Sequence, residues 1–427
     1  MTREMKNSGV EWIGDIPSEW KLEKNKHCFE LTKNIVGGNF LSYELLSLTK
    51  KGIVIKDVNN SFGKVPESYE TYQSVKKGQL VLCLFDLDCS AVFSGLSNHN
   101  GMISPAYKVY DCKNNIDKKY AAYWFDYCFD GRKYKIYSKS LRYVVNADDF
   151  GDIEIILPPL SEQKRIADFL DIKVTEIDKI ISDTKASIEN YKEYKQSVIT
   201  EAVTKGLDKN VPMKDSGIEW IGEIPVDWKV YKLKYLLDTP MLYGANETGI
   251  AYDEYLPRYI RITDITSDNK LKNDGKLSLS ENVAEPYMLK NGDILFARSG
   301  GTVGKTFIYK DTYGKCAFAG YLIRARLKNW IIPELIYYYT LTSSYDSWKN
   351  RIFIQSTIQN IGADKYCNME IAISATKKEQ KDIVNFLDNK CAEIDNLISE
   401  KEKLITNLEE YKKSLIYEYV TGKKAVE

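Results

Sequence analysis

The residues with the clearest chemical potential form a glycine-rich stretch, SGGTVGKT, at residues 299–306. The amides of such a loop can cradle a phosphate, while its lysine and threonine supply a positive charge and a hydroxyl for magnesium. A phosphate-binding P-loop, however, opens with a glycine where this chain has Ser299, and no convincing apolar strand with a following acidic residue comes after it. A nucleotide-hydrolysing enzyme that depends on Lys305 is therefore the weaker interpretation.

Other reactive side chains give little indication of catalysis. Neither His27 nor His99 has a neighbouring nucleophile motif, and the eight cysteines form no close CxxC pair, so a zinc site is not expected. Neighbouring acids such as Asp86 and Asp88 are more typical of loop caps than of metal ligands. The Pro-Pro pair at residues 157–160, LPPL, is a helix start and not the loop of an adenine methyltransferase. We therefore expect a chain that is not catalytic by itself and binds no metal.

Composition predicts a soluble protein of the cytoplasm with reduced thiols. A chain of 427 residues is long enough for two or three domains, and it contains no apolar run near the ~18 residues that span a bilayer. Its 60 basic and 60 acidic side chains give a formal net charge of zero. That balance argues against a freestanding binder of DNA phosphates, but a partner could hold the backbone while this chain contacts the bases.

The chain is a tandem duplication. MKNSGVEWIGDIPSEWK at residues 5–21 returns as MKDSGIEWIGEIPVDWK at 213–229, and EQKRIADFLDIKVTEID at 162–178 returns as EQKDIVNFLDNKCAEID at 379–395. This separation is far longer than the 20 to 50 residues of stacked repeats, so whole domains were copied. The segments between the shared ends show little obvious likeness, which predicts two different binding domains on one symmetric frame.

The shared closing segments predict two long helices. Residues 161–205 contain no proline or glycine, and their apolar stripe advances in steps of four and three, a heptad pattern that returns in the same register at 387–419. Lys195 and Lys412 interrupt the two stripes at the same level, either to fix the register or because the seam opens to solvent there. At about 1.5 Å per residue each helix is a rod of roughly 60 Å. An antiparallel pair joining two domains is expected, and a helical hairpin inside one domain core is the alternative.

The segments before each long helix have the pattern of mixed α/β domains. GQLVLCLF at 78–85 and GDILFAR at 292–298 are short strands at comparable places, and 119–130 and 333–348 are predicted helices with aromatic faces. Several basic residues of the second segment stand beside small and hydroxyl residues, which suits contacts with phosphates and base edges. These are Arg258, Arg261, Arg298, Lys305, Arg324 and Arg326.

Three features together resemble one known family. GDIPSEW and GEIPVDW open the halves, LPPLSEQKRIADFLD and TKKEQKDIVNFLD close them, and GDILFARSGGTVGKT lies inside the second. This pattern is similar to the specificity subunit of a type I restriction-modification system over essentially the whole chain. The resemblance implies an α+β pseudo-twofold tandem repeat, in which two α/β target-recognition domains are separated by a long antiparallel two-helix coiled coil. The expected boundaries are 1–160, 161–206, 207–377 and 378–427.

The resemblance also implies a function. Each recognition domain would read one half of a bipartite double-stranded DNA target, and the helices would dock two modification subunits, with restriction subunits in the full complex. S-adenosylmethionine, ATP and magnesium would belong to those partners, leaving this chain without a cofactor and away from any membrane. The repeated tryptophan motif, EWIGxIPxxW, would pack each domain against the helical frame. A P-loop-like enzyme and a coiled-coil scaffold for other proteins are the alternatives.

The resemblance finally implies candidate DNA-binding residues. In the second domain it points to the segment that begins ARSG, and in the first the corresponding segment, LCLFDLDCSA at 82–91, lacks that pattern and contributes candidates by position only. Loops before each closing motif add further amides and basic side chains. With Arg261, taken from the basic residues named above, the candidates are Asp86, Ser90, Arg142, Tyr143, Asn146, Arg261, Arg298, Ser299, Gly300, Thr302, Lys305, Gln355, Thr357, Gln359 and Asn360.

Overall fold

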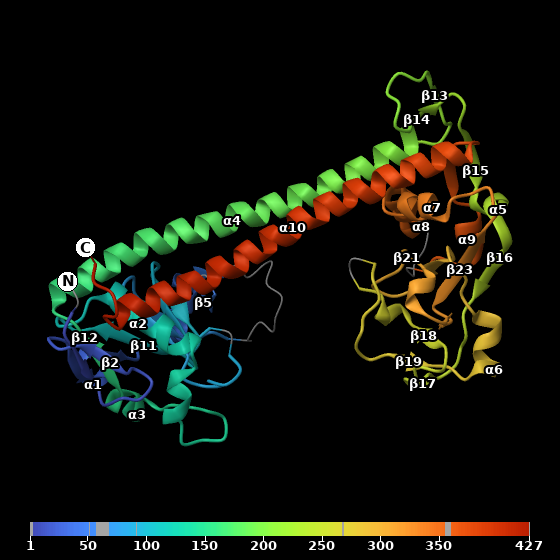
Figure 1. The fold of residues 1–427 in the computed structure, drawn as a ribbon. Helices are drawn as coiled ribbons and strands as arrows, with labels where there is room; N and C mark the ends of the chain where they lie inside the picture. The colour runs from blue at the N-terminus through green and yellow to red at the C-terminus, as the bar shows by residue number, and fades with distance from the viewer. Residues whose placement is uncertain are drawn as a thin grey trace. The chain divides into compact units, whose positions relative to one another are not determined.

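The computed structural model describes residues 3–426 apart from 51, 57–67, 91, 267–268 and 355–359. The chain divides into two compact units, Met1–Thr184 with Lys403–Glu427, and Lys185–Glu402. Each unit contains one α/β domain and a part of both long helices (Figure 1). The division cuts across these helices, whereas the boundaries predicted above follow the sequence repeats and stay a prediction.

The two long helices are α4, Leu160–Lys205, and α10, Lys377–Val420. In the first unit the start of α4 packs against the end of α10, where the rings of Phe169 and Tyr419 lie 4.5 Å apart. In the second unit the end of α4 packs against the start of α10, and Ile199 shares a buried cluster with Leu387. The helices are therefore antiparallel within each unit, which confirms the predicted coiled coil. Among the described residues, no helix is long and apolar enough to cross a membrane.

Both lysines that interrupt the apolar stripes form ion pairs across the helix seam. The Nζ atom of Lys195 lies 2.7 Å from the Oδ1 atom of Asp395 in the second unit. In the first unit Lys412 makes the equivalent pair with Asp178 at 2.6 Å. The duplication relates the two pairs, because Asp178 and Asp395 hold the same position of the repeated motif. Each lysine thus has a specific partner at this level of the seam, which favours a role in the register.

The α/β domain of the first unit is built on a four-stranded antiparallel sheet. Helix α2, Lys118–Asp130, packs on it through Trp124, Phe125 and Cys128, none of which is exposed to solvent. The strand order of the sheet is β4, Phe29–Thr32; β11, Lys108–Cys112; β8, Leu80–Leu82; and β9, Ser94–Leu96.

Four two-stranded sheets and short helices complete the described part of the first unit. The strand pairs are β1, Met5–Asn7, with β2, Asp15–Pro17; β3, Lys21–Lys24, with β12, Glu154–Leu157; β5, Leu46–Thr49, with β6, Gly52–Ile55; and β7, Gln73–Val75, with β10, Gly101–Ile103. The helices are α1, Asn25–Cys28; α3, Ala147–Asp152; and the 3-10 turns η1, Gly37–Ser42, and η2, Lys133–Tyr137.

The second unit repeats the four-stranded sheet in the same order. Its strands are β16, Leu237–Tyr243; β23, Leu322–Leu327; β20, Ile294–Ala297; and β21, Thr306–Ile308. The strands predicted in GQLVLCLF and GDILFAR are therefore β8 and β20, at the same place in the two sheets. The segments that differ in sequence share a fold because apolar residues of similar size are interchangeable in a core.

The second unit also contains a sheet without a counterpart of the same order among the described residues of the first. It consists of β17, Ile250–Ala251; β19, Leu277–Ser278; β18, Arg258–Ile260; and β22, Cys316–Phe318, of which β18 and β22 are parallel. The remaining elements are β13, Met213–Asp215, with β14, Glu223–Pro225; β15, Lys229–Lys232, with β24, Glu370–Ile373; α5, Leu233–Leu236; η3, Ile262–Asp264; α6, Glu281–Ala284; η4, Glu285–Tyr287; η5, Asp311–Tyr313; and α9, Ala363–Cys367.

The helix predicted at 333–348 is two helices, so that prediction was wrong in its extent. Helix α7 spans Pro333–Tyr339 and α8 spans Ser343–Ile354. The hydroxyl of Thr342 accepts a hydrogen bond from the amide of Tyr345 at 3.1 Å, which satisfies a free amide in the first turn of α8. The Thr342 side chain thus helps to start a second helix, although the apolar pattern of the sequence continues across this position.

The repeated tryptophan motif packs against the long helices, as predicted. Nε1 of Trp20 donates to Oε2 of Glu162 in the first turn of α4 at 2.9 Å, and a Cβ added to Gly422, just beyond α10, would lie 2.9 Å from the Trp20 ring. In the second unit Trp228 donates to Glu379 of α10 at 3.1 Å. In the second unit a Cβ added to Gly206, just beyond α4, would lie 3.4 Å from the Trp228 ring. Each motif therefore contacts the start of one long helix and the end of the other.

The shared closing motif holds each domain on its helix through two further polar residues. The buried amide of Gln163 accepts from the backbone of Asp117 and donates to Pro158, each at 2.8 Å. Gln380 binds Ile332 and Ser374 in the same way at 2.9 Å. These contacts explain why the motif is alike in both halves.

A hydrogen bond between a tyrosine of the domain and an aspartate of the long helix also occurs at equivalent positions in the two halves. The hydroxyls of Tyr123 and Tyr338 donate to Asp171 and Asp388 at 2.7 and 2.6 Å. Burial, together with the neighbouring carboxylates, raises the pKa of both tyrosines, so both remain protonated donors.

Candidate nucleic-acid interface

The candidate interface of the second unit starts where β20 ends. The backbone amide of Arg298 donates to Tyr321 at 3.0 Å, and its carbonyl accepts from Ile361 at 2.9 Å. Ser299 forms an isolated antiparallel bridge with Asn360. The ARSG segment and the end of the loop before α9 are therefore adjacent, which brings Arg298, Ser299 and Asn360 together. Gln355, Thr357 and Gln359 lie outside the described residues.

The Arg298 side chain lies near the rings of two tyrosines. The guanidinium carbon is 5.2 Å from the ring centroid of Tyr243 and 5.9 Å from that of Tyr321, within the range of cation–π attraction. The rings are 40% and 61% exposed, so the group lies at the surface. Tyr243 is anchored through its hydroxyl, which accepts from the amide of Ala363 at 2.9 Å. Neither tyrosine was among the sequence candidates, because the three residues come together only through sheet pairing.

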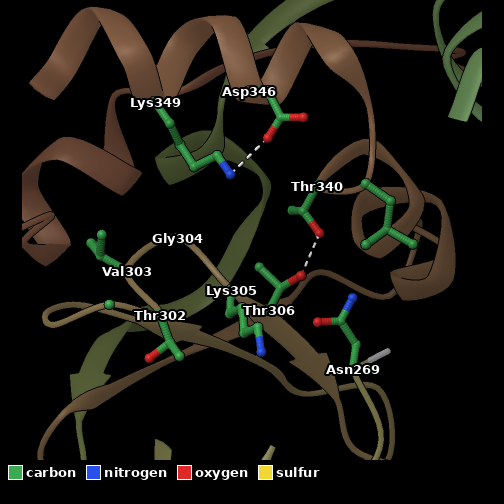
Figure 2. Close-up of a pocket in the computed structure, with 11 residues that line it drawn as sticks. Asn269, Thr302, Val303, Gly304, Lys305, Thr306, Thr340, Asp346 and Lys349 are labelled. Carbon is green, nitrogen blue, oxygen red and sulfur yellow. Dashed lines mark hydrogen bonds and ion pairs between the residues drawn. The ribbon is translucent and has the colours of Figure 1, made fainter. Parts of the chain in front are cut away.

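Thr302 and Lys305 line a cavity of about 280 Å³ at the turn between β20 and β21 (Figure 2). The ammonium of Lys305 donates to the carbonyl of Thr266 at 3.1 Å. On the opposite side of the cavity Lys349 forms an ion pair with Asp346 at 2.7 Å. The two lysines that could face a phosphate are thus already bound to oxygen atoms of the chain.

The glycine-rich stretch does not have the geometry of a P-loop. A P-loop joins a strand to a helix, whose N-terminus faces the phosphates. Here residues 299–306 join two antiparallel strands, and the chain enters β21 at Thr306. Gly300 and Gly304 adopt positive φ angles of 77° and 82°, as a tight turn requires. The nucleotide-hydrolysing alternative therefore lacks its structural basis.

The other basic candidates of the second unit are held by carboxylates or backbone oxygens. Arg261 donates from Nε and Nη2 to Asp264 at 3.0 and 2.7 Å, and this hydrogen bonding raises its pKa. Arg326 makes a similar pair with Asp293 at 2.6 Å. Arg261 caps η3 beside β18 and is not among the residues that pair with the ARSG segment.

Two further arginines are buried. A terminal nitrogen of Arg258 donates to the carbonyl of Lys272 at 2.5 Å. Burial lowers the pKa of Arg324 on β23. These side chains cannot contact a base edge without a rearrangement of the domain.

The first unit has the same loop geometry with different side chains. The amide of Val145 donates to the carbonyl of Leu84 at 2.8 Å, as Ile361 does to Arg298, so the buried Leu84 stands where the second unit has Arg298. Asp86, with φ of 50°, stands where the second unit has Gly300. Aspartate tolerates this left-handed conformation better than most residues.

The candidates in the first unit lie around this loop. The carbonyl of Asp86 accepts from the amide of Ser90 at 2.9 Å, and the Ser90 hydroxyl donates to Val92 at 3.1 Å. The carbonyl of Tyr143 accepts from the amide of Leu87 at 3.3 Å, which joins the two predicted segments. Asp86 is exposed, whereas the Ser90 hydroxyl is engaged in its own turn.

Three more candidates lie on the neighbouring loop. Tyr143 has a φ of 48°, and the ammonium nitrogen of Lys135 lies 4.2 Å from the centroid of its ring. Arg142 is exposed. Asn146 caps α3, because its Oδ1 accepts from the backbone amide of Asp149 at 2.8 Å and its Nδ2 donates to the carboxylate of Asp149. The structure thus gives Asn146 a structural role, and its role in DNA binding stays a prediction.

Comparisons with known proteins identify the family. A family model for the type I restriction modification DNA specificity domain matches residues 99–190 and 225–409. The MjaVIII specificity subunit of Methanocaldococcus jannaschii is 29% identical over 283 residues, 64% of this chain and 63% of that protein. The EcoKI specificity subunit of Escherichia coli K12 is 27% identical over 273 residues, 60% of this chain and 54% of that protein. The alignments thus span less than two thirds of either relative.

Solved structures agree in fold. A chain from a structure of complex assembly and conformational transition in the type I R-M system superposes with a TM-score of 0.72 at 14% identity, covering 96% of this chain and 99% of the other. The HsdS subunit from Thermoanaerobacter tengcongensis gives 0.51 at 14% identity, covering 96% and 98%. At this identity the likeness concerns the fold alone. Because the family model matches more than half of the residues, the chain belongs to the family of type I restriction-modification specificity subunits.

Proposed function

We propose that the chain binds double-stranded DNA and that each α/β domain reads one half of a bipartite target. The observation that carries this proposal is the repeated sheet with unlike side chains at equivalent loop positions, Arg298 against Leu84 and Gly300 against Asp86. Base edges differ in their donors and acceptors, so two domains of one fold need different side chains to read different sequences.

The long helices and the zero net charge support a complex in which partner proteins bind the DNA phosphates and this chain contacts the bases. Phosphate contacts supply most of the affinity for DNA, and this chain has no excess of basic side chains to make them. We expect two modification subunits to dock on α4 and α10 and to hold the DNA, with restriction subunits in the full complex. Adenine methylation with S-adenosylmethionine, and cleavage with ATP and magnesium, would take place on those partners in the cytoplasm.

An exchange of one domain tests the proposal. Residues 207–377 are replaced by the corresponding segment of another family member, and the methylated adenines of cells carrying the hybrid complex are mapped. Only one half of the methylated sequence should change, because the other domain is untouched. A change in both halves, or in neither, would contradict the proposal.

Gel-shift titrations provide a second test. The isolated chain should bind weakly, and the chain with its modification subunit should bind tightly and with a strong dependence on salt. If the assembled complex leaves no sequence-preferring footprint on DNA, the scaffold alternative is favoured instead.

A further inference from the structure

We infer that Arg298 determines specificity by reading the guanine of a G·C pair in the half-target of the second domain. This inference rests on the proposed function and names one of the contacts it needs. Three observations support it: the backbone and aromatic contacts of Arg298, the partners of the other cations in the second domain, and Leu84 at the equivalent position of the first domain.

The backbone of Arg298 is fixed on both sides. Hydrogen bonds to Tyr321 and from Ile361 tie it between the start of β23 and the loop before α9. Such a residue loses little further backbone freedom on binding, which improves the precision and the free energy of a contact.

The guanidinium lies against two aromatic rings, and its nitrogen atoms carry the hydrogen-bond donors. Tyr243 and Tyr321 hold the group at 5.2 and 5.9 Å from their ring centroids. No described residue accepts a hydrogen bond from it or forms an ion pair with it. A planar fork of donors held in this way matches the O6 and N7 acceptors of guanine, which an arginine contacts with two parallel hydrogen bonds.

Other cations of the second domain differ from Arg298, because their donors have partners. Arg261 and Arg326 are paired with aspartates, and Lys305 donates to a backbone carbonyl. Arg298 is therefore a cation of this loop whose donors have no partner among the described residues. Close approach of a DNA groove is also possible, because a Cβ added to Gly300 or Gly301 would meet no atom within 4 Å.

The comparison between the two domains favours a base over a phosphate. Phosphates are the same in every sequence, so a phosphate-binding residue at this position would serve both domains equally. The first domain instead has Leu84 there, buried and without a donor on its side chain. A position that changes from arginine to leucine within one fold is expected of a residue that contributes sequence discrimination.

The experiment uses the chain assembled with its modification subunit and short duplexes carrying the mapped target or single base-pair changes within it. Arg298→Ala should weaken binding of the mapped target by about 5- to 150-fold, the equivalent of 1 to 3 kcal/mol per bidentate contact. It should also make all four base pairs at one position nearly equivalent. Arg298→Lys keeps the charge but not the fork, and it should lose the same discrimination. Tyr321→Leu should lower the preference at that same position to a smaller extent.

Arg351→Ala is the matched control. Arg351 also lies over an aromatic ring, that of Trp220 in the tryptophan motif, but it belongs to α8 and not to the ARSG loop. Its replacement should leave the base preference unchanged. Circular dichroism of each variant, together with an unaltered preference in the other half of the target, establishes that the domains remain folded.

Two results would overturn the inference. Equal weakening of Arg298→Ala on every sequence, with a shallower salt dependence, would identify a phosphate contact. A wild-type half-target without any G·C pair would also refute it, although a bipartite target that responds to domain exchange would still support the proposed function. Failure of the proposed function itself would appear differently, as a target without two separable halves.

Discussion

The strongest stability prediction concerns Trp20, which contacts both long helices within the first unit. We consider Trp20→Phe, which keeps an aromatic ring but removes the indole nitrogen. In the structure that nitrogen donates to a carboxylate oxygen of Glu162 at 2.9 Å, and the tryptophan is fully buried. The guanidinium of Arg3 also binds Glu162 and lies 5.1 Å from the centre of the Trp20 ring. Removal of the donor therefore leaves a largely buried carboxylate with one partner fewer.

The magnitude follows from two contributions. A hydrogen bond to a charged group contributes about 1.5 to 3 kcal/mol to stability. Complete truncation of a buried tryptophan costs about 3 to 5 kcal/mol, so the smaller change to phenylalanine adds roughly 1 kcal/mol for the cavity. We expect the free energy of unfolding of the first unit to fall by about 2.5 to 4 kcal/mol.

Urea unfolding measures this loss, with amide hydrogen exchange in residues 160–184 as the local probe. Trp12→Phe is the control, because Trp12 is only partly buried and donates to the neutral hydroxyl of Tyr137 at 3.0 Å. It should cost about 1 kcal/mol. If Trp20→Phe destabilises the first unit no more than Trp12→Phe, the role assigned to the Glu162 contact is incorrect.

Three further predictions concern other features of the chain. A double-mutant cycle with Lys195→Ala and Asp395→Ala should give a coupling energy of about 0.2 to 1 kcal/mol in urea titrations, because the two side chains are 26% and 56% exposed; a coupling near zero would remove the pair from any role in register. Gly304→Ala should lower the melting temperature more than Gly300→Ala in the same turn. A Cβ at Gly304 would lie 2.3 Å from Cδ of Lys349, whereas one at Gly300 would meet no atom within 4 Å, and equal effects would contradict this. Cys89 is exposed, whereas the core thiols are buried, and the pKa is raised in both cases, for Cys89 by desolvation and by Asp88; access therefore decides the order, so mass-spectrometric mapping at pH 8 should find Cys89 alkylated first, and earlier labelling of a buried cysteine would contradict the structure.

The long helices could be predicted from sequence because their pattern is local. An apolar stripe without proline or glycine specifies α4 and α10, and the copied register specifies that the two can pair. The common sheet could not be seen in the same way. Its strands β8 and β20 are only short apolar runs, and their partners along the sheet are far apart in the chain. Only the pairing pattern shows that the two halves share one order of strands.

Candidate site residues were predictable by segment but not by role. Arg261 and Arg298 look alike in sequence, since both stand in strand or turn segments rich in small and hydroxyl residues. Local spacing determines the contacts of Arg261, because Asp264 three residues later binds its guanidinium. Contacts between distant segments determine the surroundings of Arg298, because Tyr243 and Tyr321 come from two other parts of the chain. Charge patterns therefore locate a surface, and the donors that remain available on it depend on the fold.

The contacts between the domains and the long helices also determine how a domain can be exchanged. A segment covering residues 207–377 includes Trp228 and Tyr338, but their carboxylate partners Glu379 and Asp388 stay on α10. An incoming segment must therefore supply a tryptophan and a tyrosine at the equivalent places, or two carboxylates lose partners in partly buried surroundings. Each missing partner is expected to cost about 1.5 to 3 kcal/mol. A hybrid that lacks both should fold poorly whatever DNA its loops could read, and restoring the two aromatic residues should recover its binding.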